Sequence, residues 1–202
     1  DSRTLFYATV KESPNSIKTR TALAAEFILA DEWGKAKEEL KIAGNLLEDN
    51  SHLQNLLGIV ADHEGNLELA EVKFRRSIEL NPDAINSHIN LAELYLKQGR
   101  LQEAGENFLV VINFYSTAEY VVRYSYIQIA LNKPDKALDV INKYFGSNDS
   151  DLSHPDISVL VGTAYFVKGD YKQALGYLKR VQELGNKAEE IGQMIRIINK
   201  KR

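Results

Sequence analysis

Short amphipathic segments follow one another along the whole chain. In the unit from Ser51 to Ala84, apolar residues recur at helical spacing on both sides of Gly65-Asn66. They are Leu53, Leu56, Leu57 and Val60 before the dipeptide, and Leu67, Ala70, Phe74 and Ile78 after it. This spacing places apolar side chains on one helix face, and a Gly-Asn pair marks a turn. The unit is therefore predicted to be two helices joined by a tight turn, with Asn81-Pro82 ending the second helix.

The same pattern returns with the period of that unit, apart from a slip of one residue and then an insertion of three. A small residue recurs in the first helix: Ala24, Gly58, Ala92, Ser125 and Gly162. An alanine recurs in the second helix: Ala36, Ala70, Ala104, Ala137 and Ala174. A large apolar residue follows one turn later: Leu40, Phe74, Phe108, Ile141 and Leu178. Small side chains let paired helices approach closely, and large ones fill the space beside them.

The turns keep the same register. One residue that tolerates positive φ stands in each turn: Asp31, Gly65, Gly99, Asn132 and Gly169. The pattern predicts helices near 17–30, 33–48, 51–64, 67–80, 85–98, 101–115, 118–131, 134–145, 155–168 and 171–184. Trp33 follows the first turn at a position that holds core formers elsewhere, so it is interpreted as a packing residue.

A unit of this length, with a small residue, an alanine, an aromatic and a closing proline, resembles the tetratricopeptide repeat. The resemblance implies an all-α, right-handed superhelical solenoid of antiparallel helix pairs, about five repeats plus a C-terminal capping helix. The expected division of the single domain 1–202 is an orphan second helix at 1–16, repeats near 17–50, 51–84, 85–117, 118–154 and 155–186, and the capping helix at 187–202. The orphan helix would belong to a repeat whose first helix lies outside this chain.

Composition narrows the function classes. With 44% hydrophobic and 26% charged residues and a net charge of −3, the chain is an ordinary globular sequence without a basic field for nucleic acid. Cysteine is absent, so disulfides and thiol chemistry are excluded. No apolar run reaches the length of a membrane span. A soluble domain is expected, standing alone or belonging to a larger or membrane-attached protein, in a compartment that the sequence does not define.

Catalytic and metal-binding motifs are missing. No phosphate-binding glycine loop or nucleophile elbow occurs, and His63-Glu64 lacks the second histidine of a zinc-protease helix. The histidines are far apart in sequence, at His52, His63, His88 and His154, and are interpreted as surface or groove residues. The chain is therefore predicted to be non-enzymatic, with no cofactor and no metal.

In tetratricopeptide proteins the first helix of each pair lines a concave groove in which extended peptides commonly bind. Carried over to this chain, the resemblance predicts a partner-binding groove containing Asn55, Ile59, Ile89, Asn90, Glu93, Val122, Arg123, Tyr126, Val159, Thr163 and Phe166. Tyr126 and Phe166 are the expected anchors, because interface energy concentrates in rigid aromatic residues. The alternative is that these residues pack against neighbouring helices. The carboxylate clamp of chaperone co-factors keeps only Asn90 and Arg123 here, so a receptor for chaperone tails is disfavoured.

Two rival functions remain open. The chain could be a self-assembling oligomeric scaffold that joins its copies through its ends or through the aromatic run from Phe114 to Tyr126, although Tyr124 stands at a core position. The opening stretch 1–16 resembles the segment that joins the last membrane helix to the repeats in transmembrane-and-tetratricopeptide glycosyltransferase-like proteins. That resemblance implies the tail of a membrane-bound protein.

Two segments are expected to be solvated. The segment from Gly146 to His154 is rich in Gly, Ser, Asn and Asp, which is typical of a loop. The final Lys200-Lys201-Arg202 is interpreted as a solubilising tail and not as a patch for nucleic acid.

Overall fold

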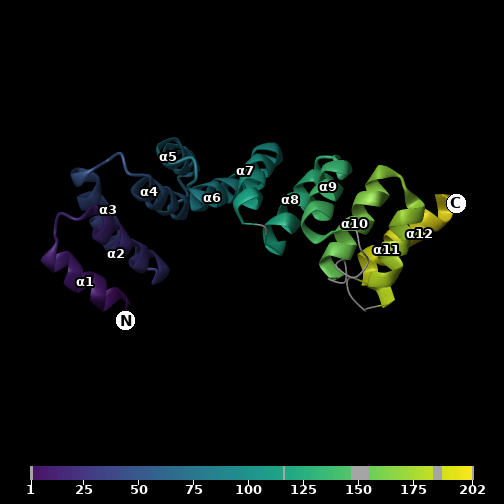
Figure 1. Ribbon diagram of the computed structural model, residues 1–202, viewed down its shortest axis with the longest axis horizontal. Helices are drawn as coiled ribbons and strands as arrows, with labels where there is room; N and C mark the ends of the chain where they lie inside the picture. The colour runs from purple at the N-terminus through teal and green to yellow at the C-terminus, as the bar shows by residue number, and fades with distance from the viewer. Residues whose placement is uncertain (1, 116, 147–154, 184–187, 202) are drawn as a thin grey trace. The chain divides into compact units, whose positions relative to one another are not determined.

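The structure, a computed structural model, describes residues 2–115, 117–146, 155–183 and 188–201. Within these ranges all regular secondary structure is helical, and the helices are labelled in Figure 1. The chain divides into two compact units, Asp1–Arg100 and Leu101–Arg202. The all-α fold class expected from the sequence is confirmed, whereas the boundaries of the repeats stay a prediction.

The first unit contains six helices in its described residues: α1 (Ser2–Glu12), α2 (Ile17–Leu29), α3 (Trp33–Leu46), α4 (Ser51–His63), α5 (Leu67–Leu80) and α6 (Ile85–Lys97). Consecutive helices pack in pairs, most extensively α2 with α3 and α4 with α5. In addition, α4 contacts both α2 and α6. The helices α2, α4 and α6 therefore lie side by side in one layer, and α3 and α5 pack against that layer.

The second unit repeats this arrangement with α7 (Leu101–Phe114), α8 (Ala118–Ala130), α9 (Pro134–Phe145), α10 (Pro155–Lys168), α11 (Tyr171–Glu183) and α12 (Ala188–Lys201). The closest pairs are α8 with α9 and α10 with α11, and α8 also contacts α10. The first helices of these two pairs are thus neighbours, as they are in the first unit.

The helices from α2 to α11 begin at the predicted residues and end within two residues of the predicted positions. Local hydrogen bonds explain several of the starts. The side chains of Asn50 and Asn66 accept from the backbone N–H groups of Leu53 at 2.9 Å and Leu69 at 3.1 Å. An asparagine at this position satisfies a helix N–H group that has no partner within the helix.

The turns adopt the predicted left-handed backbone. Gly65, Gly99 and Gly169 have φ between 73° and 86°, and the two non-glycine residues in the same slot, Asp31 and Asn132, have φ of 57° and 56°. Asp and Asn tolerate this conformation better than other side-chain-bearing residues. The register read from the sequence is therefore correct at every turn between paired helices.

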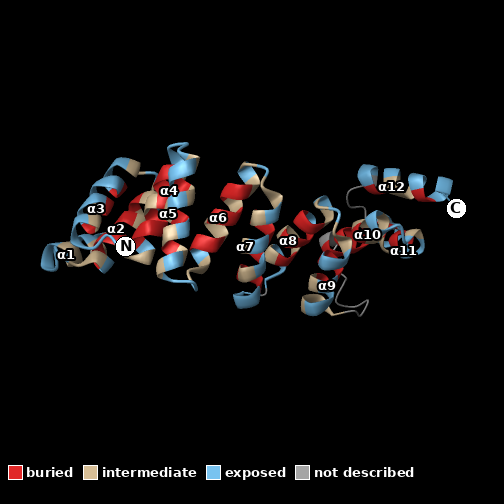
Figure 2. Ribbon diagram, turned by 90° about the horizontal axis from the view of Figure 1, so that it is seen from above, coloured by how far each residue is buried: buried red, intermediate tan, exposed pale blue. Residues whose placement is uncertain are grey.

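The repeated small, alanine and large positions lie in the core. All fifteen residues of the three columns are buried. The closest approach occurs where the small residue is glycine, since a Cβ atom on Gly58 would lie 2.5 Å from the Phe74 ring and one on Gly162 would lie 2.8 Å from Leu178. Figure 2 marks the buried residues of the helices in red.

The two terminal helices pack on one side. Phe6 and Val10 of α1 lie against the buried residues Leu23, Phe27 and Ala36. At the other end, Ile191 and Ile198 of α12 join a buried cluster that contains residues of α10 and α11. A helix near the start of the chain is confirmed, but its origin in a further repeat stays a prediction.

The two segments expected to be solvated have different outcomes. Lys200 and Lys201 lie in the last turn of α12, and the Lys201 ammonium donates to the Tyr171 hydroxyl at 2.9 Å. These two lysines are therefore part of the last helix, and Lys201 also links it to α11. The expected loop from Gly146 to His154 lies outside the described residues, except for Gly146.

Candidate functional site

A cavity of about 290 Å³ opens on the layer of first helices in the first unit. It is lined by Ala25, Ile28 and Leu29 of α2, by His52, Asn55, Leu56 and Ile59 of α4, and by Asn86, Ile89 and Asn90 of α6. Three helices that are separated by second helices in the sequence thus contribute to one site. The repeat brings them together because each helix pair is followed by another pair in the same orientation.

The cavity lining combines aliphatic side chains with uncharged hydrogen-bonding groups. None of its lining residues is Asp, Glu, Lys or Arg. Leu29 of this lining is 81% exposed, the largest exposed fraction among the described large hydrophobic residues. Desolvation lowers the pKa of His52, which favours the uncharged imidazole. The site is therefore electrically neutral, with an apolar surface open to solvent.

A buried series of hydroxyl groups supports the cavity from behind. The Ser51 and Ser77 hydroxyls lie 3.0 Å apart, and the Ser77 and Ser87 hydroxyls lie 2.7 Å apart. The Ser87 hydroxyl then donates to Asn55 Oδ1 at 3.0 Å. Ser77 and Ser87 are almost fully buried, so these bonds join α4, α5 and α6 beneath the cavity. A connected buried network of this kind restricts the side chains that it reaches.

The network sets the orientation of the Asn55 carboxamide. Asn55 Oδ1 accepts a second hydrogen bond, from Asn90 Nδ2 at 3.0 Å. The Asn55 oxygen therefore accepts from two protein donors. The Asn55 Nδ2 group takes no part in this network. Conversely, Asn90 uses its nitrogen within the protein and presents Oδ1 as an acceptor. The hydrogen bonds thus fix which end of each carboxamide is engaged with the protein, and both residues belong to the cavity lining.

The predicted groove residues of the first unit are mostly brought together. Asn55, Ile59, Ile89 and Asn90 line the cavity, whereas Glu93 lies on α6 outside the lining and is half-buried. Sequence reasoning missed Asn86 as a lining residue, and it placed His52 only among the surface or groove residues. A signal for them exists, because they occupy equivalent positions of successive repeats, one turn before Asn55 and Ile89.

The predicted residues of the second unit behave differently from one another. Tyr126 of α8 is 42% exposed, and Val122 and Arg123 are half-buried on the same helix. Arg123 forms an ion pair with Glu119 at 3.2 Å. The Tyr126 side chain is therefore accessible on α8, as the groove prediction requires.

Of the three predicted residues on α10, Val159 is buried, and Thr163 and Phe166 are half-buried. Val159 is only 6% exposed and belongs to the buried cluster of α10, α11 and α12, and its role as a groove residue stays a prediction. The Thr163 hydroxyl donates to the Val159 carbonyl oxygen at 2.7 Å. Phe166 is half-buried, with its ring centroid 5.9 Å from that of Tyr171. The packing of α10 on α11 explains this burial. The hydrophobic period of one helix does not distinguish a face that is covered in this way from a face that is open to solvent.

One of the histidines differs from expectation. His88 is buried, with 8% exposure, and its Nε2 lies 3.1 Å from the Pro82 carbonyl oxygen, so it is a core residue and not a surface one. His63 is exposed but stacks on Trp33, with ring centroids 3.6 Å apart. The packing role predicted for Trp33 agrees with this contact and with its place beside the buried core. His154 lies outside the described residues.

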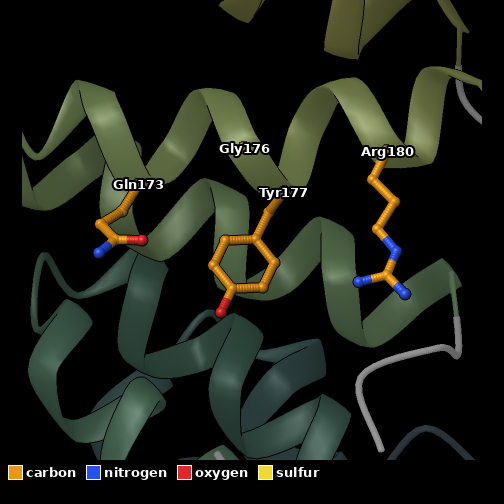
Figure 3. Close-up of a pocket in the computed structure, with 4 residues that line it drawn as sticks. All are labelled: Gln173, Gly176, Tyr177 and Arg180. Atoms are coloured by element: carbon orange, nitrogen blue, oxygen red, sulfur yellow. The ribbon is translucent and has the colours of Figure 1, made fainter. Parts of the chain in front are cut away.

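A second hollow, of about 300 Å³, lies on α11 and was not predicted from the sequence. Figure 3 shows Gln173, Tyr177 and Arg180 projecting from the same side of the helix, with Gly176 between them. The Tyr177 ring stacks on Tyr165 of α10, with centroids 5.9 Å apart. This hollow belongs to a second helix of a pair and therefore differs from the cavity on the first helices.

An ionic cluster on α5 and α6 is structural. Glu71 accepts hydrogen bonds from Arg75 and from the Tyr95 hydroxyl, both at 2.9 Å, and from Arg100 at 2.7 Å. Burial alone would raise the pKa of Glu71, but the hydrogen bonds from Arg100, Tyr95 and Arg75 outweigh it and lower the pKa. Burial raises the pKa of Tyr95, whose ring lies beneath the Arg100 guanidinium. These four side chains bind one another, so the cluster stabilises the fold.

The described residues hold no candidate for two other kinds of site. No three His, Asp or Glu side chains in this part of the chain gather in a way that could hold a metal ion. None of the helices there is both long and apolar enough to cross a membrane.

Comparison with known proteins identifies the fold. A family profile described as tetratricopeptide repeat matches residues 73–106. The chain carries the tetratricopeptide-repeat fold. The structure of YrrB, described as a TPR protein with an unusual peptide-binding site, superposes with a TM-score of 0.76 at 14% identity, covering 95% of this chain and 97% of that one. Comparison with curated protein sequences finds no match.

Two further structures share this tetratricopeptide fold. PilF of Pseudomonas aeruginosa gives a TM-score of 0.62 at 14% identity, with 88% of each chain covered. A chain of the Naa15/Naa10 complex bound to HypK-THB gives 0.66 at 15% identity, covering 97% of this chain and 30% of that one. Identities this low establish the fold alone. The resemblance of residues 1–16 to glycosyltransferase-like membrane proteins stays a prediction.

Proposed function

We propose that this tetratricopeptide chain is a non-enzymatic interaction module that binds a peptide or protein segment on its layer of first helices. The observation that carries the proposal is the open cavity formed by α2, α4 and α6. Its lining of aliphatic groups and fixed amides is typical of a recognition surface, because such sites combine apolar contact with a few placed polar groups.

The similar structures support this proposal by their own properties. YrrB is described as having a peptide-binding site, and the Naa15/Naa10 structure is described as bound to HypK-THB. Both share the helix-pair fold of this chain. We therefore expect protein recognition of this chain as well, at the cavity that its own helices α2, α4 and α6 form.

The test begins with peptides selected from a random phage-displayed library on the immobilised full chain. Binding of the most enriched peptide is then measured by fluorescence anisotropy. Ile59→Asp and Ile89→Asp should each weaken binding by about tenfold or more, because each places a charge in the apolar lining. The controls Lys73→Ala and Lys179→Ala, on second helices, should leave binding unchanged. Equal loss in all four variants, or none in the cavity variants, would rule out this surface.

Self-assembly is a second candidate function, favoured by the exposed aromatic pair at the end of α7. Phe114 and Tyr115 are 53% and 58% exposed, whereas Tyr124 is buried, as predicted. Adjacent exposed aromatics are common at protein interfaces. Light scattering over a concentration series tests this candidate: a mass that rises with concentration and returns to one protomer in Phe114→Ser supports it. A mass fixed at one protomer removes it.

A further inference from the structure

Resting on the proposed function, we propose that the cavity of α2, α4 and α6 selects an internal peptide segment carrying an uncharged aliphatic side chain. The segment's main chain would pair with Asn55 and Asn90, and its aliphatic side chain would lie among Ile28, Ile59 and Ile89. The inference names a class of ligand and adds to the proposed location of binding.

The hydrogen-bonding groups match a peptide main chain. Each peptide unit presents one N–H donor and one C=O acceptor. Asn55 Nδ2 is held as a donor because its oxygen is occupied by Ser87 and Asn90. Asn90 Oδ1 is held as an acceptor because its nitrogen donates to Asn55. The pair can therefore bind a peptide C=O and N–H without reading the side-chain sequence.

The apolar lining provides the selectivity. Ile28, Leu29, Ile59 and Ile89 surround the amide pair on three helices. Burial of apolar surface on these residues favours an aliphatic side chain in proportion to the area removed from water. The volume of about 290 Å³ lies at the lower end of the range for ligand sites, which suits one side chain with its adjoining peptide groups.

The charge distribution disfavours acidic and basic residues. The cavity lining contains no ionic side chain. Farther along the same helices, Asp62 of α4 and Lys97 of α6 pair with each other at 2.6 Å. A charged ligand group in the cavity would lose its hydration without gaining a counter-ion, which is unfavourable. A terminal carboxylate is disfavoured for the same reason, so an internal segment fits better than a chain end.

The experiment uses the most enriched peptide from the random library as its probe. Its aliphatic residue is replaced in turn by Asp, Lys and Ala, and its C-terminus is compared as amide and as carboxylate. Binding to the wild-type chain should fall about tenfold or more for Asp and Lys, and less for Ala. The amide and the carboxylate should bind equally, because the terminus lies outside the cavity.

Two protein variants test the main-chain pairing. Asn55→Asp keeps an oxygen that accepts from Ser87 and Asn90 but replaces the donor group by an acceptor, so binding should fall about tenfold. Asn86→Ala alters an exposed residue of the same lining outside the hydroxyl network, and it should change binding less than Asn55→Asp. Circular dichroism confirms that both variants are folded. Unchanged binding by Asn55→Asp would overturn the pairing.

The outcomes separate the inference from the proposed function. Enriched peptides that require an acidic or basic residue, yet still lose binding to Ile59→Asp, would overturn the inference and leave the proposed function intact. Enrichment that is equal on wild type and Ile59→Asp, or no enrichment at all, would overturn both. An aliphatic consensus that loses binding to Ile59→Asp and to Asn55→Asp supports both.

Discussion

Gly58 of α4 lies directly against the Phe74 ring of α5. A Cβ atom on Gly58 would lie 2.5 Å from two atoms of the Phe74 ring, and Phe74 is itself buried. Glycine at this position allows α4 and α5 to approach, and phenylalanine occupies the space that glycine leaves. The two residues belong to the small and large columns of the same repeat.

The first prediction is that Gly58→Ala destabilises the protein by about 1–3 kcal/mol, because overpacking outweighs the better helix propensity of alanine. The measurement is the free energy of unfolding from urea denaturation. Gly176→Ala is the matched control, since Gly176 lies within α11 with no atom within 4 Å of the added Cβ. The control should stabilise the protein by up to about 1 kcal/mol. Similar changes for both variants would contradict the packing argument.

His88 provides the second prediction. It is buried and bonded to the Pro82 carbonyl oxygen, so His88→Ala should leave a cavity and an unpaired acceptor. A loss of about 1–3 kcal/mol in the free energy of unfolding is expected. His52→Ala, which changes an exposed residue of the cavity lining, should cost about 0.5 kcal/mol or less, as is usual for surface substitutions. Equal losses in the free energy of unfolding for the two variants would contradict the core position of His88.

The third prediction concerns pH. The pKa of Glu71 is lowered in the folded protein, so its ionised form stabilises the fold. This contribution is fully present above the unfolded pKa of about 4.3 and is lost as the pH falls through the lower folded pKa. Unfolding free energies of wild type and Glu71→Gln should therefore differ most above about pH 5 and converge in acid. A difference that stays constant with pH would contradict this role.

Glu68→Gln is the control for this pH experiment. Glu68 is exposed on the same helix and makes none of the hydrogen bonds that Glu71 makes to Arg100, Tyr95 and Arg75. Its replacement tests whether the effect belongs to the cluster or to any carboxylate of α5. The convergence in acid should be seen with Glu71→Gln and not with Glu68→Gln.

The fourth prediction concerns α1. This helix packs against α2 through Phe6 and Val10, while Tyr7 remains 40% exposed. A terminal element with neighbours on one side opens more easily than an internal helix pair. Residues 2–12 should therefore exchange amide hydrogens faster than α4 and α5 in a dilute sample, measured by mass spectrometry. Exchange as slow as that of α4 would show that α1 is as stable as the internal repeats.

The sequence alone determined the helices, the turns between them and the recurring buried positions. Repeated spacing located the starts from Ile17 to Tyr171, and Asp31 and Asn132 were identified as turn residues beside the glycines. These features depend on local periodicity and backbone sterics, which are written in short stretches of sequence. The small and large columns could be predicted as well, because a small residue that allows close approach and a large residue that fills the space beside it recur with the repeat.

Only the tertiary structure decided which residues of the first helices remain accessible. Val159 and Asn55 occupy equivalent positions of their repeats and each is 6% exposed, yet Val159 belongs to the buried cluster of α10, α11 and α12, whereas Asn55 lines an open cavity. The orientation of Asn55 also depends on a partner that is distant in sequence, Ser87, whose hydroxyl lies beside that of Ser77. A helical period gives the direction of a side chain from its own axis, but its exposure depends on what the neighbouring helices place in front of it.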